Sequence, residues 1–173
     1  MTELFEILKY ILPALIVFFT SYYLLRSQLK HQEKIKSKEI SLRQQQVVTP
    51  LKLQAYERLS LFLERISPES LIMRLNRENK SARQFQADLL NTIRSEYSHN
   101  VSQQIYVSGA CWEIIRSAKE NTIKLINKTA DSLPKGANAQ AFSKVFLTTV
   151  MEQPSTPSKI ALDYLKKEVQ QYF

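Results

Sequence analysis

The sequence predicts an all-α protein with an N-terminal transmembrane helix, a helical stalk and then a small helical bundle. Three observations support this fold class. The 173 residues include only two glycines, too few for the many tight turns of a β-sandwich or barrel. The first 25 residues are almost wholly apolar. The remainder repeats apolar side chains at helical spacing and keeps no clean two-residue alternation.

Residues 4–25 form the predicted transmembrane helix. From Tyr10 to Leu25 the chain carries no charge, and the full segment has about 22 residues. At ~1.5 Å per residue such a helix measures ~33 Å, enough to cross a hydrocarbon core of ~30 Å. Tyr10 at one end, with Tyr22 and Tyr23 at the other, matches the aromatic belts of spanning helices.

A cleaved signal peptide and a buried core helix are the two alternatives for this segment. A signal peptide begins with a basic region and ends at small residues, whereas this chain begins with Glu3 and Glu6 before Lys9. A core helix of this length usually keeps a polar face. The transmembrane reading is therefore favoured over both.

Basic residues crowd the segment that follows, and they predict the orientation. The positive-inside rule places this flank in the cytoplasm, so the N-terminus faces out and residues 49–173 face in. The single cysteine, Cys111, suits a reducing compartment. The basic side chains are also expected to contact anionic lipid headgroups. The predicted headgroup contacts are Arg26, Lys30, Lys34, Lys36 and Lys38.

Residues 26–48 form the predicted stalk. They contain no glycine or proline, so the membrane helix can continue through them. Their apolar residues do not keep a firm heptad, and a solvated helix is favoured over a two-stranded coiled coil.

Residues 49–173 form the predicted cytoplasmic domain, a bundle of five or six helices. Thr49-Pro50, Ser67-Pro68 and Thr156-Pro157 each resemble an N-cap followed by proline at the first helical position. Ser108 is the expected N-cap of the clearest amphipathic helix. Residues 76–80 are read as a loop, and 99–107 as either a helix extension or an ordered loop. The predicted helices are 51–66, 68–75, 81–98, 109–133, 137–151 and 157 to almost 173.

Each of these helices has an apolar face that predicts its buried side chains. Leu61 is an exception, because it falls within the polar strip of helix 51–66. We interpret it as an exposed leucine and a candidate partner contact. The other helices bury side chains at three- and four-residue steps. The expected core includes Leu53, Tyr56, Leu59, Phe62, Leu63, Ile66, Phe85, Leu89, Ile93, Tyr97, Cys111, Ile115, Ala118, Thr122, Ile126, Leu133, Phe142, Val145, Phe146 and Val150.

No catalytic, cofactor or metal signature stands out. Glu96 and His99 share the Glu-x-x-His spacing of di-iron bundles, but those proteins use the element twice and this chain has it once. Cys111 falls on a predicted buried face, which favours a small core residue over a nucleophile. With two glycines, the chain has no phosphate-binding glycine loop. The sequence therefore predicts a protein that is not an enzyme and has no cofactor, metal or small-molecule substrate.

Nucleic-acid binding is an open alternative, because the formal net charge is +8. The basic residues are interleaved with acidic ones, however, and no helix-turn-helix or aromatic stacking platform is visible. A solvated basic surface is favoured.

Most of the chain resembles a family of uncharacterised small bacterial proteins. The resemblance is carried by LQAYERLSLFLERISPESLIMRL, SEYSHNVSQQIYVS and AKENTIKLIN, and it extends to YILPALIVFFTSYYLL. It implies a bacterial inner-membrane protein with one N-terminal membrane helix and a helical cytoplasmic domain. It implies no activity, ligand or catalytic residue.

Together these observations predict a membrane-anchored, non-enzymatic helical module that binds protein partners. Its role would be that of an accessory or scaffold subunit in a membrane complex. The alternative is a basic domain that tethers nucleic acid or ribosomes to the lipid bilayer.

Overall fold

The structure, a computed structural model, describes the backbone of residues 2–75 and 80–172. Side chains are described from residue 15 onward, except at 37, 41, 76–79, 172 and 173. The described residues are helical and contain no strand, which confirms the all-α fold class. The elements are α1 (Thr2–Arg65), α2 (Pro68–Leu75), α3 (Ala82–Asn100), the 3-10 helix η1 (Val101–Ile105), α4 (Gly109–Ser132), α5 (Ala139–Met151) and α6 (Pro157–Tyr172).

The chain divides into two compact units, residues 1–49 and 50–173. The first unit is the N-terminal part of α1, and its described side chains are exposed, apart from a partly buried Thr49. The second unit contains the last turns of α1 and all the other helices.

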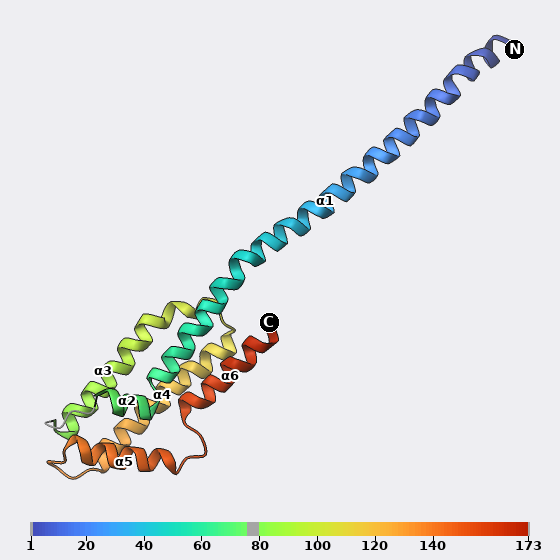
Figure 1. The fold of residues 1–173 in the computed structure, drawn as a ribbon. Helices are drawn as coiled ribbons and strands as arrows, with labels where there is room; N and C mark the ends of the chain where they lie inside the picture. The colour runs from blue at the N-terminus through green and yellow to red at the C-terminus, as the bar shows by residue number, and fades with distance from the viewer. Residues whose placement is uncertain (1, 76–79, 173) are drawn as a thin grey trace. The chain divides into compact units, whose positions relative to one another are not determined.

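The second unit is a helical bundle in which α4 is the central helix. It packs against α6, α3 and α5, and α2 contacts α3 and α5. Figure 1 shows α3, α4 and α6 running alongside the last turns of α1, while α5 lies across one end of these helices.

The core of the bundle is aromatic and aliphatic. Phe85 and Phe142 meet edge to face with ring centroids 5.6 Å apart, and Phe146 lies 5.7 Å beyond Phe142. These rings join α3 to α5. Most of the expected core is buried. The largest fully buried side chains are Phe62, Phe85, Phe142, Phe146, Leu59, Leu63, Ile66, Leu71, Leu89, Ile93, Ile115 and Ile126.

Side-chain caps help to fix where α2 to α6 begin. At α2 and α6 the predicted caps accept backbone N–H groups, Ser67 that of Ser70 at 3.4 Å and Thr156 that of Lys159 at 3.2 Å. Ser81 and Gln84 form a capping box at the start of α3, in which each side chain bonds the other residue's backbone N–H. Ser108 caps α4, as predicted, by accepting the N–H of Cys111 at 3.1 Å. Asn138 caps α5 through the N–H of Ala141 at 2.9 Å. Such caps satisfy backbone donors that have no partner inside the helix.

Two backbone hydrogen bonds join the starts of α3 and α5, and we call this pair the cap clasp. The N–H of Ala82 donates to the carbonyl of Ala137 at 2.9 Å, and the N–H of Ala139 donates to that of Lys80 at 3.0 Å. They form an isolated antiparallel bridge centred on Ser81 and Asn138. Two helices distant in sequence therefore begin at one place.

The prediction that a new helix begins at Thr49-Pro50 is wrong, because α1 passes through Pro50 without a break. Proline cannot donate the usual helical hydrogen bond. Gln46, whose carbonyl loses that donor, is exposed, so water can bond the carbonyl instead.

Two of the expected core residues are exposed. Leu53 is 43% exposed, because it lies two residues, or about 200° of helical rotation, before buried Ala55. Val145 is 36% exposed at the flank of the stripe formed by Phe142 and Phe146. The segment 99–107, for which the sequence leaves two alternatives open, extends α3 to Asn100 and continues as η1. Residues 76–79 of the predicted loop 76–80 lie outside the described part of the chain.

Candidate functional site

A buried carboxylate, Glu168 of α6, lies at the meeting point of three helices. It is 6% exposed and accepts the Tyr56 hydroxyl of α1 at 2.9 Å. It also accepts the backbone N–H of Ser108 at 3.0 Å and the Ser108 hydroxyl. Ser108 is the N-cap of α4, so the carboxylate lies at the positive end of a 24-residue helix. We call these residues, with Cys111, the Glu168 cluster.

The hydrogen bonds keep Glu168 ionised in spite of its burial. Burial by itself raises the pKa of a carboxyl group. Hydrogen bonds from the side chain and backbone of Ser108, and from Tyr56 and Cys111, outweigh it and hold the pKa of Glu168 below its ordinary value. The cluster therefore contains a satisfied negative charge.

The pKa of Cys111 is shifted in the opposite direction, upward. Its side chain is fully buried, as the sequence predicts. Burial, followed by the charge of Glu168 and a hydrogen bond to it, raises the pKa of the thiol to about 12. Because the thiolate is the nucleophilic form, a thiol that stays protonated at neutral pH is inert.

We expect the stability of the protein to fall in alkaline solution because of Cys111. Between pH 9.0 and about 12 the unfolded thiol ionises and the folded one does not, so each pH unit costs about 1.4 kcal/mol. Urea unfolding measures the free energy of unfolding at about pH 8 and at about pH 10.5. Its decrease between these two pH values should be about 2 kcal/mol smaller in Cys111→Ala than in the wild type. Contributions that the two proteins share cancel in this comparison. An equal loss in both proteins would contradict the assignment.

The Glu168 cluster is suited to holding helices together rather than to chemistry. None of its members lines any of five surface hollows on the described residues. Sequence reasoning identified Ser108 and Cys111 but missed Glu168 and Tyr56 as partners. The sequence pattern could have identified Glu168 as buried, because it continues the spacing of buried Ala161 and Leu165 along α6. A carboxylate on such a stripe must find donors.

A second candidate site is a surface hollow of about 310 Å³ between α1 and the end of α3. It brings together Leu61 and the Glu96–His99 pair, which the sequence singled out separately. Leu61 is exposed, as predicted, at 51%. We call this site the arginine–leucine hollow. Its lining residues are Arg58, Leu61, Phe62, Arg65, Glu96, His99 and Asn100.

Glu96 is engaged by two arginines. Arg65 approaches it at 3.2 Å and Arg74 of α2 at 3.4 Å. Arg74 also donates to the backbone carbonyl of Arg65 at 2.8 Å. In the described part of the chain, no three His, Cys, Asp or Glu side chains are grouped so that they could hold a metal ion. The Glu96 carboxylate thus belongs to an ion-pair network.

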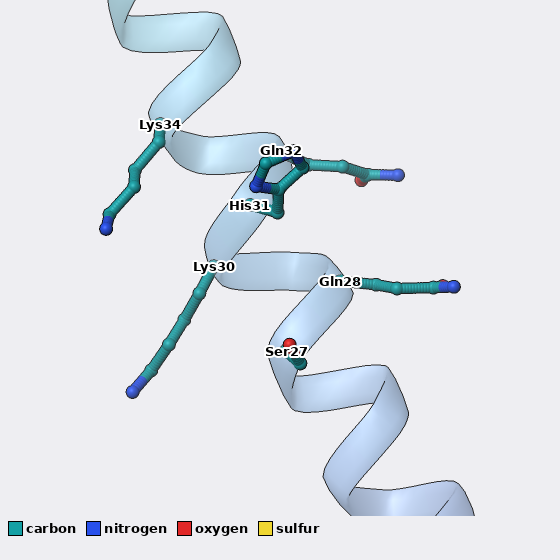
Figure 2. A pocket seen from close by; sticks show the side chains of 6 residues that line it. All are labelled: Ser27, Gln28, Lys30, His31, Gln32 and Lys34. Carbon is teal, nitrogen blue, oxygen red and sulfur yellow. The ribbon is translucent and has the colours of Figure 1, made fainter.

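The predicted headgroup contacts are exposed on α1. Figure 2 shows Lys30 and Lys34 extending from one side of the helix and Gln28 and Gln32 from the opposite side. The hollow beside them is an open groove along a single helix. The structure shows these side chains exposed and assigns them no ligand.

The predicted transmembrane segment is only partly covered, because the side chains of residues 4–14 lie outside the described residues. Between residues 15 and 36, where they are described, all side chains are exposed, including Phe18 at 62% and Tyr23 at 75%. Within the described residues, none of the helices combines the length and the apolar character that a membrane crossing requires.

Comparison with known proteins gives one finding. No curated protein and no solved structure matches this chain significantly. The model of one family, described as a family of unknown function (DUF7935), matches residues 2–172. This match spans all the sequence on which the resemblance to an uncharacterised family rests. Since it covers nearly the whole chain, the protein belongs to the DUF7935 family.

Proposed function

We propose that this protein is a membrane-anchored, non-enzymatic helical module that binds protein partners as an accessory or scaffold subunit. One observation carries the proposal. Residues 15–25 of α1 expose large apolar side chains, from Leu15 at 47% to Tyr23 at 75%, with no other element of their unit to cover them. Burying apolar surface contributes roughly 25 cal/mol per Å², so such a helix favours an apolar environment outside the chain.

The anchor in this proposal is the whole of residues 4–25, in the lipid bilayer of a bacterial inner membrane. Support comes from the sequence, where about 22 residues of low charge precede the basic residues from Arg26 to Lys38. Those residues contact headgroups on the cytoplasmic side, and residues 49–173 are cytoplasmic.

The non-enzymatic role is supported by the chemistry of the second unit. Its buried thiol has a pKa of about 12, and its buried carboxylate accepts hydrogen bonds from Tyr56 and Ser108. Neither group is poised to attack a substrate or exchange a proton with one near neutral pH.

A charge placed in the apolar segment tests the anchor. Val17→Arg is expected to move the protein from carbonate-washed membranes toward the soluble fraction, because a central arginine costs about 2.5–3.5 kcal/mol on insertion scales. Leu42→Arg is the matched control, an exposed apolar residue on the same helix beyond the proposed anchor. Wild-type protein that stays soluble without detergent would refute the anchor.

Partner binding is tested by recovery from detergent-solubilised membranes. A stoichiometric protein partner is expected to remain bound as salt is raised. If the recovered partner is nucleic acid or a ribosome, lost steeply with salt, the tethering alternative replaces the proposal. A protein recovered alone contradicts both.

A further inference from the structure

We propose that the arginine–leucine hollow is the docking site for an acidic segment of a partner protein, one that presents an apolar side chain flanked by carboxylates. The inference rests on the proposed function and names the partner chemistry. The hollow lies wholly within the second unit, between α1 and the end of α3.

Two apolar side chains line the hollow. Leu61 is 51% exposed, whereas the next residue, Phe62, is only 1% exposed. Arg58 and Arg65 lie three residues before and four residues after Leu61, so they share its face of the helix. Glu57 and Glu64 flank Leu61 at the same spacing but on the other side of the helix, outside the hollow. On the side that lines the hollow, the leucine and its two arginines fit an apolar side chain accompanied by negative charge.

The charge of the hollow is positive. Two guanidinium groups, from Arg58 and Arg65, line the hollow with a single carboxylate, that of Glu96, and Arg74 pairs with Glu96 from outside the lining. Glu96 already pairs with Arg65 and Arg74. Arg58 makes no ion pair or hydrogen bond with any residue that the structure describes, so its five N–H groups are open to a partner. Complementary charge therefore comes from carboxylates on the partner.

Two of the arginines are held in place before any partner arrives. Arg74 spans from Glu96 at 3.4 Å to the Arg65 carbonyl at 2.8 Å, and Arg65 bonds Glu96 at 3.2 Å. The Glu96 side chain that anchors them is only 14% exposed. Side chains fixed in this way lose less conformational entropy on binding than free surface arginines.

The exposed Leu61 in the lining favours a protein segment over a nucleic acid. Phosphates bring charge without an apolar group to cover Leu61. Bases bind by stacking on exposed aromatic rings, whereas the aromatic residue of this hollow, Phe62, is buried. Arginine beside apolar side chains is typical of protein–protein contact sites.

Photo-crosslinking in intact cells tests the inference. A diazirine amino acid replaces Leu61 in the full chain, and the captured segment is sequenced by mass spectrometry. The matched control carries the same probe at Ile160, a residue of similar exposure (56%) on α6. The expected result is a protein segment rich in Asp and Glu around an apolar residue, captured at Leu61 and not at Ile160.

Three variants of the Leu61 probe protein make the result specific. Arg58→Glu should lower the crosslinking yield on the order of tenfold, while Arg58→Lys retains most of it, because the reversal sets like charges against each other. Arg94→Glu, an exposed arginine of α3 that does not line the hollow, should leave the yield unchanged. Capture of a protein without this dependence on Arg58 overturns the inference.

The remaining outcomes separate this inference from the proposed function. A captured lipid, nucleic acid or basic segment overturns the docking site. A partner recovered from solubilised membranes but not captured at Leu61 overturns the hollow and leaves the proposed function standing. Recovery of no partner by either route refutes both.

Discussion

Replacing Glu168 by alanine is expected to lower the free energy of unfolding by about 3–5 kcal/mol. The substitution strips the Tyr56 hydroxyl and the Ser108 N–H and hydroxyl of their common acceptor. Each buried donor left unsatisfied costs about 1–3 kcal/mol, and the helix dipole of α4 loses its negative partner. Denaturant unfolding of the full chain, followed by circular dichroism, measures the change.

Two variants separate the charge of Glu168 from its position. Glu168→Gln keeps an acceptor oxygen but sets an amide among donors, so a loss of about 1–2 kcal/mol is expected. Asp163→Ala, an exposed carboxylate of the same helix, should change stability by less than about 0.5 kcal/mol. Equal effects of the Glu168 and Asp163 variants would show that the cluster holds nothing together.

The pH dependence of the Glu168 effect has a definite sign. The folded pKa lies below the ordinary value of 4.5, so the unfolded state binds the proton more readily. The stabilisation by the ionised group is therefore complete above about pH 4.5 and is lost as the pH falls through the lower, folded value. The difference in free energy of unfolding between the wild type and Glu168→Ala should therefore become smaller at acidic pH.

Replacing Phe142 by alanine is expected to cost about 3–5 kcal/mol, because it opens a cavity that the surrounding helices fill only in part. Phe142 is fully buried between Phe85 and Phe146, and its edge contact with Phe85 holds α5 against α3. Aromatic pairs of this geometry add about 0.5–1.5 kcal/mol beyond the buried area. The denaturant concentration at the unfolding midpoint should therefore be lower for Phe142→Ala than for the wild type.

The control for Phe142 lies on the same helix. Met151 is 85% exposed near the end of α5, and Met151→Ala should change the free energy of unfolding by less than about 0.5 kcal/mol. A Phe142 variant that unfolds like this control would show that α5 does not belong to the core.

Local chemistry explains which parts of the fold were predictable. The start of α4 at Ser108 and the start of α3 at Ser81 follow from hydroxyl caps within three residues of the amides they bond. Apolar stripes such as Phe85, Leu89 and Ile93 follow from helical spacing. The predicted helix start at Thr49-Pro50 is wrong because an exposed helix tolerates proline when water replaces the missing hydrogen-bond donor.

The candidate sites depend on contacts that spacing cannot show. Tyr56 and Glu168 lie 112 residues apart, and Arg65 and Glu96 lie 31 apart. Leu61 could be recognised as an exposed leucine from its place in a polar strip. That it shares a hollow with Glu96 depends on how α1 packs against α3, which periodicity alone leaves open.

The cap clasp limits which sequences this fold accepts. Its two bonds run between main-chain atoms, so most substitutions at Lys80 or Ala137 leave them intact. The donors, however, are the amides of Ala82 and Ala139, and proline has no amide hydrogen to give. Divergent members of the family can therefore vary at Lys80 and Ala137, whereas Ala82 and Ala139 are buried and accept only small residues. Proline at either of these two donors would remove one of the bonds that join the starts of α3 and α5.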